Sequence, residues 1–346
     1  MNTNMSHVAH ITKNKSNLEL RFLITKLVRE FFWSKNFTEV ETPLIVKYPG
    51  QEPYLSPMSL KIHNEKSEEF NSYLHTSPEY TMKKMLSAGF ENIFSICKCF
   101  RDFESFGGTH NPEFTMIEWY RTKVDYFRIM EDVEGLFNYI LDSLINNFKF
   151  EILNFKTILN NQIFKFERMT MKELWEKYVG VNLDEFLTQE KMLELCRMRG
   201  YKPREDENFE DLFYWVFLNE IEPKLVDQFV IIYEYPAQMA ALARLSKKDS
   251  RYAERFEVYI NGLELANAFS ELNNAEEQLQ RLKEEQDLRK KLGKEVYEID
   301  REFVEALKTM PESAGIALGV DRLVQFFGGL QNIDNVIVLP SAKLFE

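Results

Sequence analysis

The chain has 346 residues, of which 45% are hydrophobic and 28% are charged, ordinary values for a globular protein. Its formal net charge is −12 and its basic residues occur only in short runs, which weakens the case for a protein that holds nucleic acid through phosphate contacts. We find neither a signal-peptide pattern nor an apolar run approaching the ~20 residues of a membrane span. We therefore expect a cytoplasmic protein without a membrane partner.

The N-terminal part of the chain predicts a tail, a helix and a strand. Residues 1–16 have the polarity of a flexible tail. Apolar residues then recur at helical spacing over 17–36, and Ser16 and Glu19 fit a capping box at the start of this helix. Residues 37–43 have a strand pattern that ends at a proline.

Two further strand patterns lie at 93–100 and 113–120. The polar, glycine-containing residues 101–112 between them predict a long hairpin loop. Cys97 and Cys99, in the first of these strands, do not have the spacing of a zinc site, and side chains two residues apart on a strand share one face. We interpret both as small core residues; with Cys196 the count is odd, which fits no disulfide framework.

The rest of the chain alternates helical and strand patterns. Residues 125–225 predict a connecting helix and a mostly helical insertion without recognisable chemistry. The patterns that follow are strand 229–233, strand 255–259, charged helix 275–292 and a strand-to-helix segment at 315–327. The length permits one large domain with an insertion or two ordinary domains.

Three segments could carry chemistry. Arg101 ends a strand beside the hairpin loop, where a guanidinium can grip a phosphate; a solvated arginine on a surface hairpin is the alternative. Glu264 and Glu271 stand seven residues apart with Asn267 between them. These oxygen ligands suit Mg²⁺ bound together with nucleotide phosphates, and a solvated strand end is the alternative.

The third segment is residues 315–322. Its small residues would let a flat ring approach a strand, and Arg322 opens the next helix, where anions are favoured. Close packing of the helix on the strand explains the same pattern. The sequence has neither a P-loop nor a glycine-rich dinucleotide fingerprint, so a nucleotide site would have to be built on a sheet with arginine clamps.

In their order along the chain, these segments resemble motifs 2 and 3 of the class II aminoacyl-tRNA synthetases, and helix 17–36 with the strand to Pro43 resembles motif 1. The strongest resemblance is to the lysyl-tRNA synthetases, and within them to the truncated branch that attaches (R)-β-lysine to elongation factor P. The resemblance covers residues 17–340. The matching phrases are Thr76–Tyr80, His110–Tyr120, Ala253–Tyr259, Glu264–Asn267 and Ala317–Leu323.

Two features favour the truncated branch. Motif 1 begins near residue 17, which leaves no room for the anticodon-binding domain that precedes it in a lysyl-tRNA synthetase. Ala317 stands where the synthetases have glycine, and one added methyl in a tight pocket can change which lysine isomer fits. Other positions depart from the family pattern. Glu104 stands one residue later than the usual motif 2 glutamate, Ala268 replaces a glycine, and Glu276 is synthetase-like.

The resemblance implies an α+β class II catalytic core over 17–346, with an antiparallel sheet flanked by helices and a helical insertion. It implies a ligase that uses ATP and Mg²⁺ to activate lysine, and specifically (R)-β-lysine, as the adenylate. The acceptor it implies is a lysine side chain of elongation factor P, with tRNA not expected as a partner. It also implies a homodimer formed through motif 1. The alternatives are a tRNA ligase without an anticodon-binding domain and a non-catalytic amino-acid-binding paralogue.

The same resemblance implies the site. Arg101, Arg322 and Glu271 would carry catalysis: Arg101 would hold the α-phosphate and Arg322 the terminal phosphate. Glu264 and Glu271 would bind Mg²⁺, and Phe114 would stack on adenine. The residues implied to bind ATP are Arg101, Glu104, His110, Asn111, Phe114, Glu264, Leu265, Gly319 and Arg322. The residues implied to bind the lysine substrate are Ser77, Pro78, Glu79, Tyr120, Asn267, Glu271 and Ala317.

Overall fold

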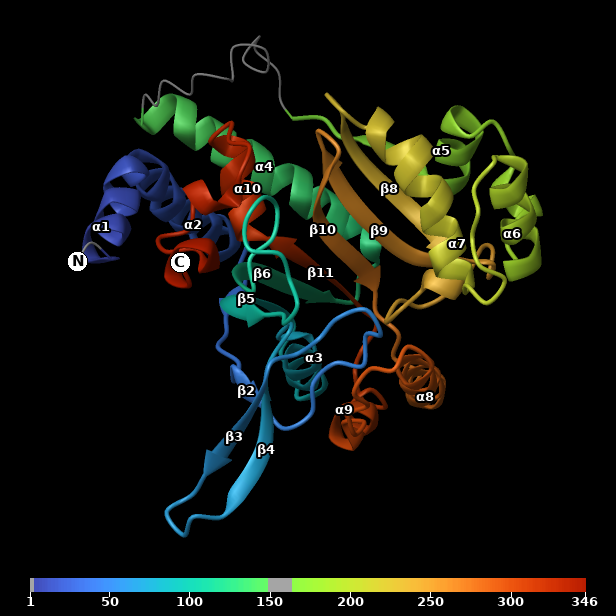
Figure 1. The fold of residues 1–346 in the computed structure, drawn as a ribbon, viewed down its shortest axis with the longest axis horizontal. Helices are drawn as coiled ribbons and strands as arrows, with labels where there is room; N and C mark the ends of the chain where they lie inside the picture. The colour runs from blue at the N-terminus through green and yellow to red at the C-terminus, as the bar shows by residue number, and fades with distance from the viewer. Residues whose placement is uncertain (1–2, 149–163) are drawn as a thin grey trace.

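An eight-stranded sheet forms the centre of the computed structural model, which describes residues 3–148 and 164–346 (Figure 1). The strand order is β1-β5-β6-β11-β10-β9-β8-β7, and only the two outermost pairs, β1–β5 and β7–β8, are parallel. The predicted α+β fold with an antiparallel sheet is confirmed. The strands of this sheet are β1 (Thr38–Glu39), β5 (Asn92–Phe100), β6 (Glu113–Thr122), β7 (Glu167–Thr170), β8 (Phe229–Pro236), β9 (Tyr252–Ile260), β10 (Leu263–Ser270) and β11 (Ser313–Gly319).

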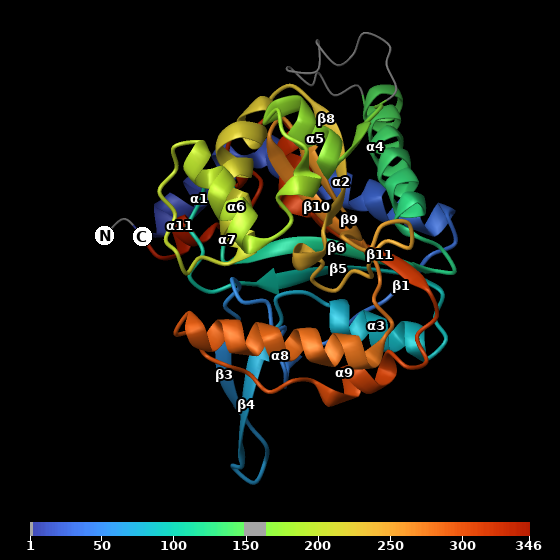
Figure 2. The same ribbon diagram turned by 90° about the vertical axis from the view of Figure 1, so that its right-hand side faces the viewer.

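Helices cover both faces of the sheet (Figure 2). The long helices α2 and α4 pack with α10 on one face over the largest hydrophobic core, and α3, α8 and α9 lie on the other. The helices beside the sheet are α2 (Lys15–Ser34), α3 (Glu79–Ser87), α4 (Tyr126–Phe148), α8 (Ala275–Lys291), α9 (Arg301–Ala306) and α10 (Val320–Phe327). Among the described residues, no helix combines the length and apolarity needed to cross a bilayer.

Strand alternation separates the core from a second, polar face of the sheet. On β6, Ile117 and Trp119 are buried in the core beneath α2 and α4, so the residues between them point the other way. On β11, Ile316 and Leu318 face the core, whereas Ala317 faces away from it. The side of the sheet toward α3 and α8 is therefore free to carry a site.

The insertion has its own hydrophobic core. Its helices are α5 (Met171–Tyr178), α6 (Gln189–Met198) and α7 (Phe209–Val216), which pack around Trp175 and Phe213 against β8. The sequence did not predict β7, which extends the main sheet by pairing with β8. Residues 149–163 of the predicted insertion lie outside the described residues.

Three expectations near the N-terminus are wrong. The expected flexible tail contains a helix, α1 (Thr3–Lys13), whose His7 and His10 rings hydrogen bond to the carbonyls of Lys343, in α11 (Ser341–Leu344), and Ile337. The capping box is absent because α2 begins at Lys15, one residue before its proposed cap. The strand expected over 37–43 is reduced to β1, which has only two residues.

A projecting hairpin was also not predicted. Strands β2 (Ile45–Val46), β3 (Ser59–His63) and β4 (Glu69–Leu74) form a separate three-stranded sheet in the order β2-β4-β3. Its outer end extends away from the body of the molecule (Figure 1). Most of its side chains are solvent-exposed, so it lacked the apolar alternation by which strands are recognised.

Candidate active site

A cavity of ≈ 370 Å³ lies on the polar face of the sheet. Of the residues implied by resemblance, only Pro78 is absent from its lining; Pro78 is instead the residue that precedes α3. The cavity brings together residues from three strands, β6, β10 and β11, from α3 and from the start of α10. The implied residues that line it are Ser77, Glu79, Arg101, Glu104, His110, Asn111, Phe114, Tyr120, Glu264, Leu265, Asn267, Glu271, Ala317, Gly319 and Arg322.

The register of three central strands sets the order of residues along the cavity. Asn267 of β10 lies opposite Ala317 of β11, which lies opposite Glu118 of β6. Two residues away along β11, Gly315 lies beside Tyr120. In the other direction, Gly319 lies beside Met116, about 13 Å from the level of Gly315 at the usual strand rise. The cavity therefore has two ends, with Ala317 between them.

A β-bulge in β10 brings Glu264, in the strand, and Glu271, which directly follows it, to the same side of the sheet. In a regular strand, residues seven positions apart point to opposite faces. Here Glu264 pairs with Tyr259 and Ala266 pairs with Val258, so one extra residue is inserted at Leu265. The bulge reverses the alternation, and both carboxylates line the cavity.

At the end of the cavity near Gly319, Arg101 lies against the ring of Phe114. The guanidinium carbon is 5.0 Å from the ring centroid, so it covers one face of the ring. The Arg101 Nε is buried and lacks a hydrogen-bond partner among the residues that the structure describes. A buried N–H group without a partner is costly, and an anionic ligand would satisfy it.

The loop after Arg101 turns Glu104 inward. Phe103 has a φ of 59° and a side chain that is 91% exposed, whereas Glu104 lines the cavity. The left-handed conformation of Phe103 gives a physical reason for the one-residue shift from the family pattern. Glu104 therefore lies where it could take part in binding.

The side chain of Arg322 contacts both the loop between β5 and β6 and the strand β10. Its guanidinium donates to the carbonyl of Glu264 at 2.6 Å and lies 3.1 Å from Nε2 of His110. Partial burial, with the nearby Arg322 charge, lowers the pKa of His110, which favours a neutral ring that accepts this hydrogen bond. The side chain of Asn111 is occupied differently: it donates to the carbonyl of Glu113 and accepts from the backbone N–H of Ser341. It therefore holds the loop in place.

The other end of the cavity is acidic, and two of its carboxylates pair with a buried cation. The ammonium nitrogen of Lys83, a residue that the sequence reasoning missed, lies 2.5 Å from carboxylate oxygens of both Glu79 and Glu271. Burial alone would lower the pKa of Lys83, but the two carboxylates outweigh it and raise the pKa. Burial raises the pKa of Glu271 to about 7, although Lys83 opposes this shift.

Glu118 is a second missed residue, and it lies at the middle of the cavity floor. It is 1% exposed and accepts hydrogen bonds from the hydroxyls of Ser77, at 2.5 Å, and Tyr120, at 2.8 Å. Burial, reinforced by the charge of Glu79, raises the pKa of Glu118 well above its usual value. A cationic ligand beside Glu118 would reverse this shift, so the pocket favours a substrate that carries ammonium groups.

Gly315 is a third residue that the sequence did not single out. A Cβ at this position would lie 2.2 Å from the Tyr120 ring and 2.8 Å from Oε1 of Glu271. Only glycine leaves room for the tyrosine ring this close to β11. Two further carboxylates, Glu52 and Glu285, line the cavity from outside the sheet, and burial raises the pKa of Glu285 to about 8.

Buried networks behind the cavity fix its walls. Arg255 donates to the side chains of Asn267 and Glu257 and to the carbonyl of Met239. On the opposite wall, Asp321 accepts from the backbone N–H of Thr115 at 2.7 Å and is paired with Arg21 of α2. The first set of bonds ties β10 to β9, and the second ties α10 to β6 and α2.

Comparisons with known proteins agree with this geometry. The family model described as class II tRNA synthetases (D, K and N) matches residues 3–343. An elongation factor P–(R)-β-lysine ligase of Avibacterium paragallinarum is 38% identical over 94% of this chain and 95% of its own length. Proteins of the same name from Actinobacillus succinogenes and Haemophilus influenzae are 37% and 34% identical, over 94% and 97% of this chain and 95% and 98% of their own lengths. The chain therefore belongs to the class II tRNA synthetase family.

Proposed function

We propose that this protein activates (R)-β-lysine with ATP and transfers it to a lysine side chain of elongation factor P. The observation that carries the proposal is a single cavity with arginines at one end and buried carboxylates at the other. The first end suits the phosphates of ATP, and the second suits a substrate with two ammonium groups. The names of the similar proteins support the same substrate and acceptor.

The first step is attack of the substrate carboxylate on the α-phosphorus of ATP. The new bond joins a carboxylate oxygen to phosphorus, the bond to the β-phosphate oxygen breaks, and pyrophosphate leaves. A carboxylate with a pKa near ~3.5 is already ionised at neutral pH, so no general base is needed. Arg101 and Arg322 bind phosphate oxygens, and Glu79 and Glu118 bind the ammonium groups. Catalysis then rests on positioning and charge stabilisation.

We propose that Glu264 and Glu271 bind magnesium. Glu264 and Glu271 face the same cavity, and Oε1 of Glu271 has no hydrogen-bond partner among the described residues. When bound, the ion would neutralise negative charge on the phosphates. Because Lys83 already pairs with Oε2 of Glu271, this residue would offer its other oxygen.

In the second step, the neutral ε-amine of an acceptor lysine attacks the carbonyl carbon of the adenylate. An amide bond forms, the bond from that carbon to the phosphate oxygen breaks, AMP leaves, and the amine releases a proton to solvent. We also propose a homodimer, as expected for the family, with α2 at the interface. Its support is that α2 exposes Phe22 and Trp33, which stand eleven residues apart and therefore lie on the same side of the helix.

Intact-mass measurement tests the function. Purified elongation factor P and bulk tRNA are each incubated with the enzyme, ATP and either α-lysine or (R)-β-lysine. A mass increase of elongation factor P with (R)-β-lysine, lost in Arg101→Ala and kept in the surface variant Arg204→Ala, is expected. Arg204 is a matched control because its side chain is 74% exposed and lies outside the cavity. Charging of tRNA with α-lysine, with elongation factor P unmodified, would overturn the proposal.

A further inference from the structure

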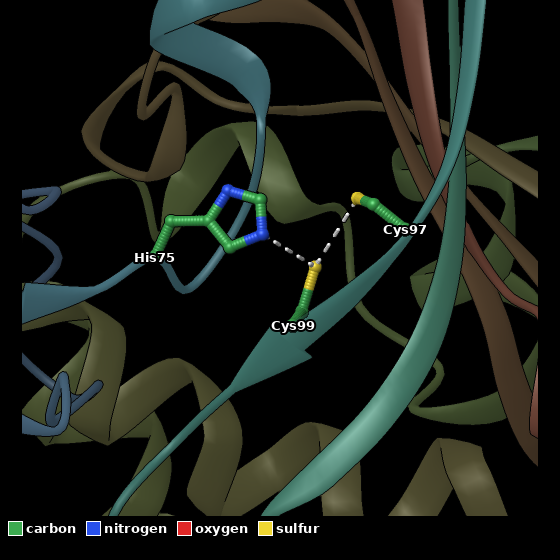
Figure 3. Close-up of side chains that lie close together, drawn as sticks. All are labelled: His75, Cys97 and Cys99. Carbon is green, nitrogen blue, oxygen red and sulfur yellow. Dashed lines mark hydrogen bonds between the residues drawn. The ribbon is translucent and has the colours of Figure 1, made fainter. Parts of the chain in front are cut away.

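A cluster of soft ligand atoms lies outside the cavity described above. His75, Cys97 and Cys99 place one nitrogen and two sulfur atoms within 4.8 Å of one another (Figure 3). The two cysteines project from the same side of β5, and His75 approaches them from the segment that follows β4. His75 stands more than twenty residues before the cysteines in the sequence, so the spacing of the cysteines alone did not reveal it.

We propose that His75, Cys97 and Cys99 bind a soft d¹⁰ metal ion of the zinc(II) class. Two thiolates and an imidazole are a ligand set typical of zinc. A fourth position would be left for water or another small ligand. This site is separate from the proposed magnesium site, whose ligands are carboxylates, and does not depend on the proposed function.

Two of the three interatomic distances fit such an ion closely, and the third, between the His75 ring nitrogen and Sγ of Cys97, is within 4.8 Å. In a tetrahedral zinc site, two sulfur ligands are about 3.8 Å apart and a nitrogen and a sulfur about 3.6 Å apart, from the usual bond lengths. The Sγ atoms of Cys97 and Cys99 are 4.0 Å apart, and Nε2 of His75 is 4.0 Å from Sγ of Cys99. Shifts of a few tenths of an ångström close these two gaps, which side-chain rotations can supply. A disulfide would instead require the sulfurs to approach to about 2.05 Å, although they lie on one strand.

The surroundings hold the ligands in place. His75 is 3% exposed and Cys99 is fully buried. The backbone of His75 is fixed on both sides, by its N–H to the carbonyl of Leu44 at 2.9 Å and by its carbonyl to the N–H of Phe100 at 3.1 Å. The imidazole therefore cannot move far from the thiols. His75 also lines a second cavity, which gives an ion a route to the ring.

The hydrogen bond made by the His75 ring shows which protons must leave when the metal binds. Nε2 of His75 is 2.6 Å from the carbonyl of Lys98, so in the metal-free protein this nitrogen carries the proton and donates it. On binding, the nitrogen loses this proton, the ring takes one at Nδ1 from solvent, and each protonated thiol releases its proton to solvent. The bond to Lys98 is lost in exchange for the bond to the metal.

The position of the site links it to the cavity. His75 is followed by Thr76 and Ser77, and the Ser77 hydroxyl donates to Glu118. An ion bound by all three ligands would cross-link this segment to β5. It would thereby restrain Ser77, two residues after His75.

Cobalt(II) titration of the full chain, stripped of metal with a chelator and kept in a non-thiol reductant, tests the proposal. We expect a thiolate-to-cobalt charge-transfer band that saturates at one ion per chain and is displaced by zinc(II). Cys97→Ser and Cys99→Ser should each weaken binding by more than about tenfold, since loss of even an outer-shell partner costs that much. Zinc should also raise the thermal unfolding midpoint of the wild type but not of these variants.

Cys196→Ser is the matched control, because Cys196 is also buried but lies in the core of the insertion, where it donates to the carbonyl of Leu212. This variant should keep the band and the affinity. Circular dichroism establishes that each variant is folded. The proposal is overturned if the folded wild type gives no band, if the band persists unchanged in Cys97→Ser or Cys99→Ser, or if thiol titration shows Cys97 and Cys99 joined as a disulfide.

Discussion

Lys83 bridges Glu79 and Glu271, with its ammonium nitrogen 2.5 Å from an oxygen of each. The lysine and Glu271 are each 1% exposed. The acidic end of the cavity therefore has an internal counter-ion before any substrate enters. This arrangement lets two carboxylates lie close together without a substrate and leaves Oε1 of Glu271 available.

Replacement of Lys83 by methionine should be strongly destabilising. The substitution preserves much of the volume but leaves the buried Glu271 and the partly buried Glu79 without their partner. Breaking a buried ion pair costs about 3–5 kcal/mol. Chemical denaturation at neutral pH measures this as a lower free energy of unfolding. Lys84→Met is the matched control, because the adjacent Lys84 pairs with Asp300 but is 32% exposed. The control should cost about 1 kcal/mol or less, and equal losses in the two variants would contradict the interpretation.

Glu118→Gln should weaken use of the amino acid selectively. The amide keeps the shape of the carboxyl group but cannot supply the negative charge that the ammonium groups require. A lost charge-assisted hydrogen bond of about 1.5–3 kcal/mol corresponds to a decrease of about 10–150-fold in kcat/KM for the amino acid. Amino-acid-dependent exchange of pyrophosphate into ATP measures this, with the KM for ATP expected to be unchanged.

Glu113→Gln provides the control for Glu118. Glu113 begins the same strand, but its side chain is 51% exposed and pairs with Lys98 on the surface. Its replacement should leave the exchange rate unchanged. If Glu118→Gln retains wild-type kcat/KM, Glu118 does not bind the substrate.

Gly315→Ala should disrupt the pocket, because the added methyl would lie 2.2 Å from the Tyr120 ring. The ring must move, at a cost of about 1–3 kcal/mol for overpacking. We expect a lower unfolding midpoint and loss of most amino-acid-dependent exchange. Gly319→Ala is the control for stability, since the nearest atom to its Cβ would be 3.8 Å away. A Gly315→Ala protein as stable and active as the wild type would show that the tyrosine is not held against β11.

The sequence predicted those parts of the site that depend on local pattern. Phe100 ends β5, Arg101 directly follows it, and Glu113 begins β6, as the alternation and the polar loop indicated. The bulge at Leu265 could not be predicted, because it is defined by how β10 pairs with β9. Seven-residue spacing alone would have placed Glu264 and Glu271 on opposite faces.

Lys83 and His75 were missed for a different reason. Neither residue belongs to a recognisable local motif, and the role of each depends on partners that are distant in the sequence. Lys83 stands four residues after Glu79 on α3, which is the spacing of a surface ion pair, and nothing in that spacing reveals that Glu271 lies on its other side. The helix α1 was missed because its few apolar residues do not form a continuous stripe.

Glu285 should make the stability of the protein fall as the pH rises from its unfolded pKa toward 8. Burial raises the pKa of its folded-state carboxyl to about 8, above an unfolded value of about 4.3. A raised folded-state pKa gives stability that is fully present below the unfolded pKa and is lost as pH rises through 8. By linkage, ionisation of this group costs about 2–3 kcal/mol between pH 6 and pH 9.

Glu285→Gln removes this titration. The free energy of unfolding of the variant should therefore exceed that of the wild type by more at pH 9 than at pH 6, measured by denaturant titration at both values. Glu284→Gln is the control, because Glu284 is exposed on the same helix. Parallel pH profiles for Glu285→Gln and the wild type would show that Glu285 is not held in a desolvated position.

The proposed dimer interface gives a prediction about assembly. Phe22 and Trp33 are 59% and 51% exposed. Two large apolar side chains exposed to water on one side of a helix are unusual in a monomeric protein and indicate an interaction surface. A two-fold interface places the same patch against its own copy, so one charged substitution enters the interface twice. Phe22→Glu should therefore convert the protein to a monomer, as measured by light scattering.

Trp215→Glu is the matched control for the assembly prediction. Trp215 is a large apolar residue with 38% exposure, but it lies on α7 in the insertion, away from α2. This variant should keep the mass of the wild type. A wild-type protein that is monomeric at micromolar concentration, or a Phe22→Glu protein that keeps the dimeric mass, would exclude α2 as the interface, and the exposed side of α2 would then need another partner.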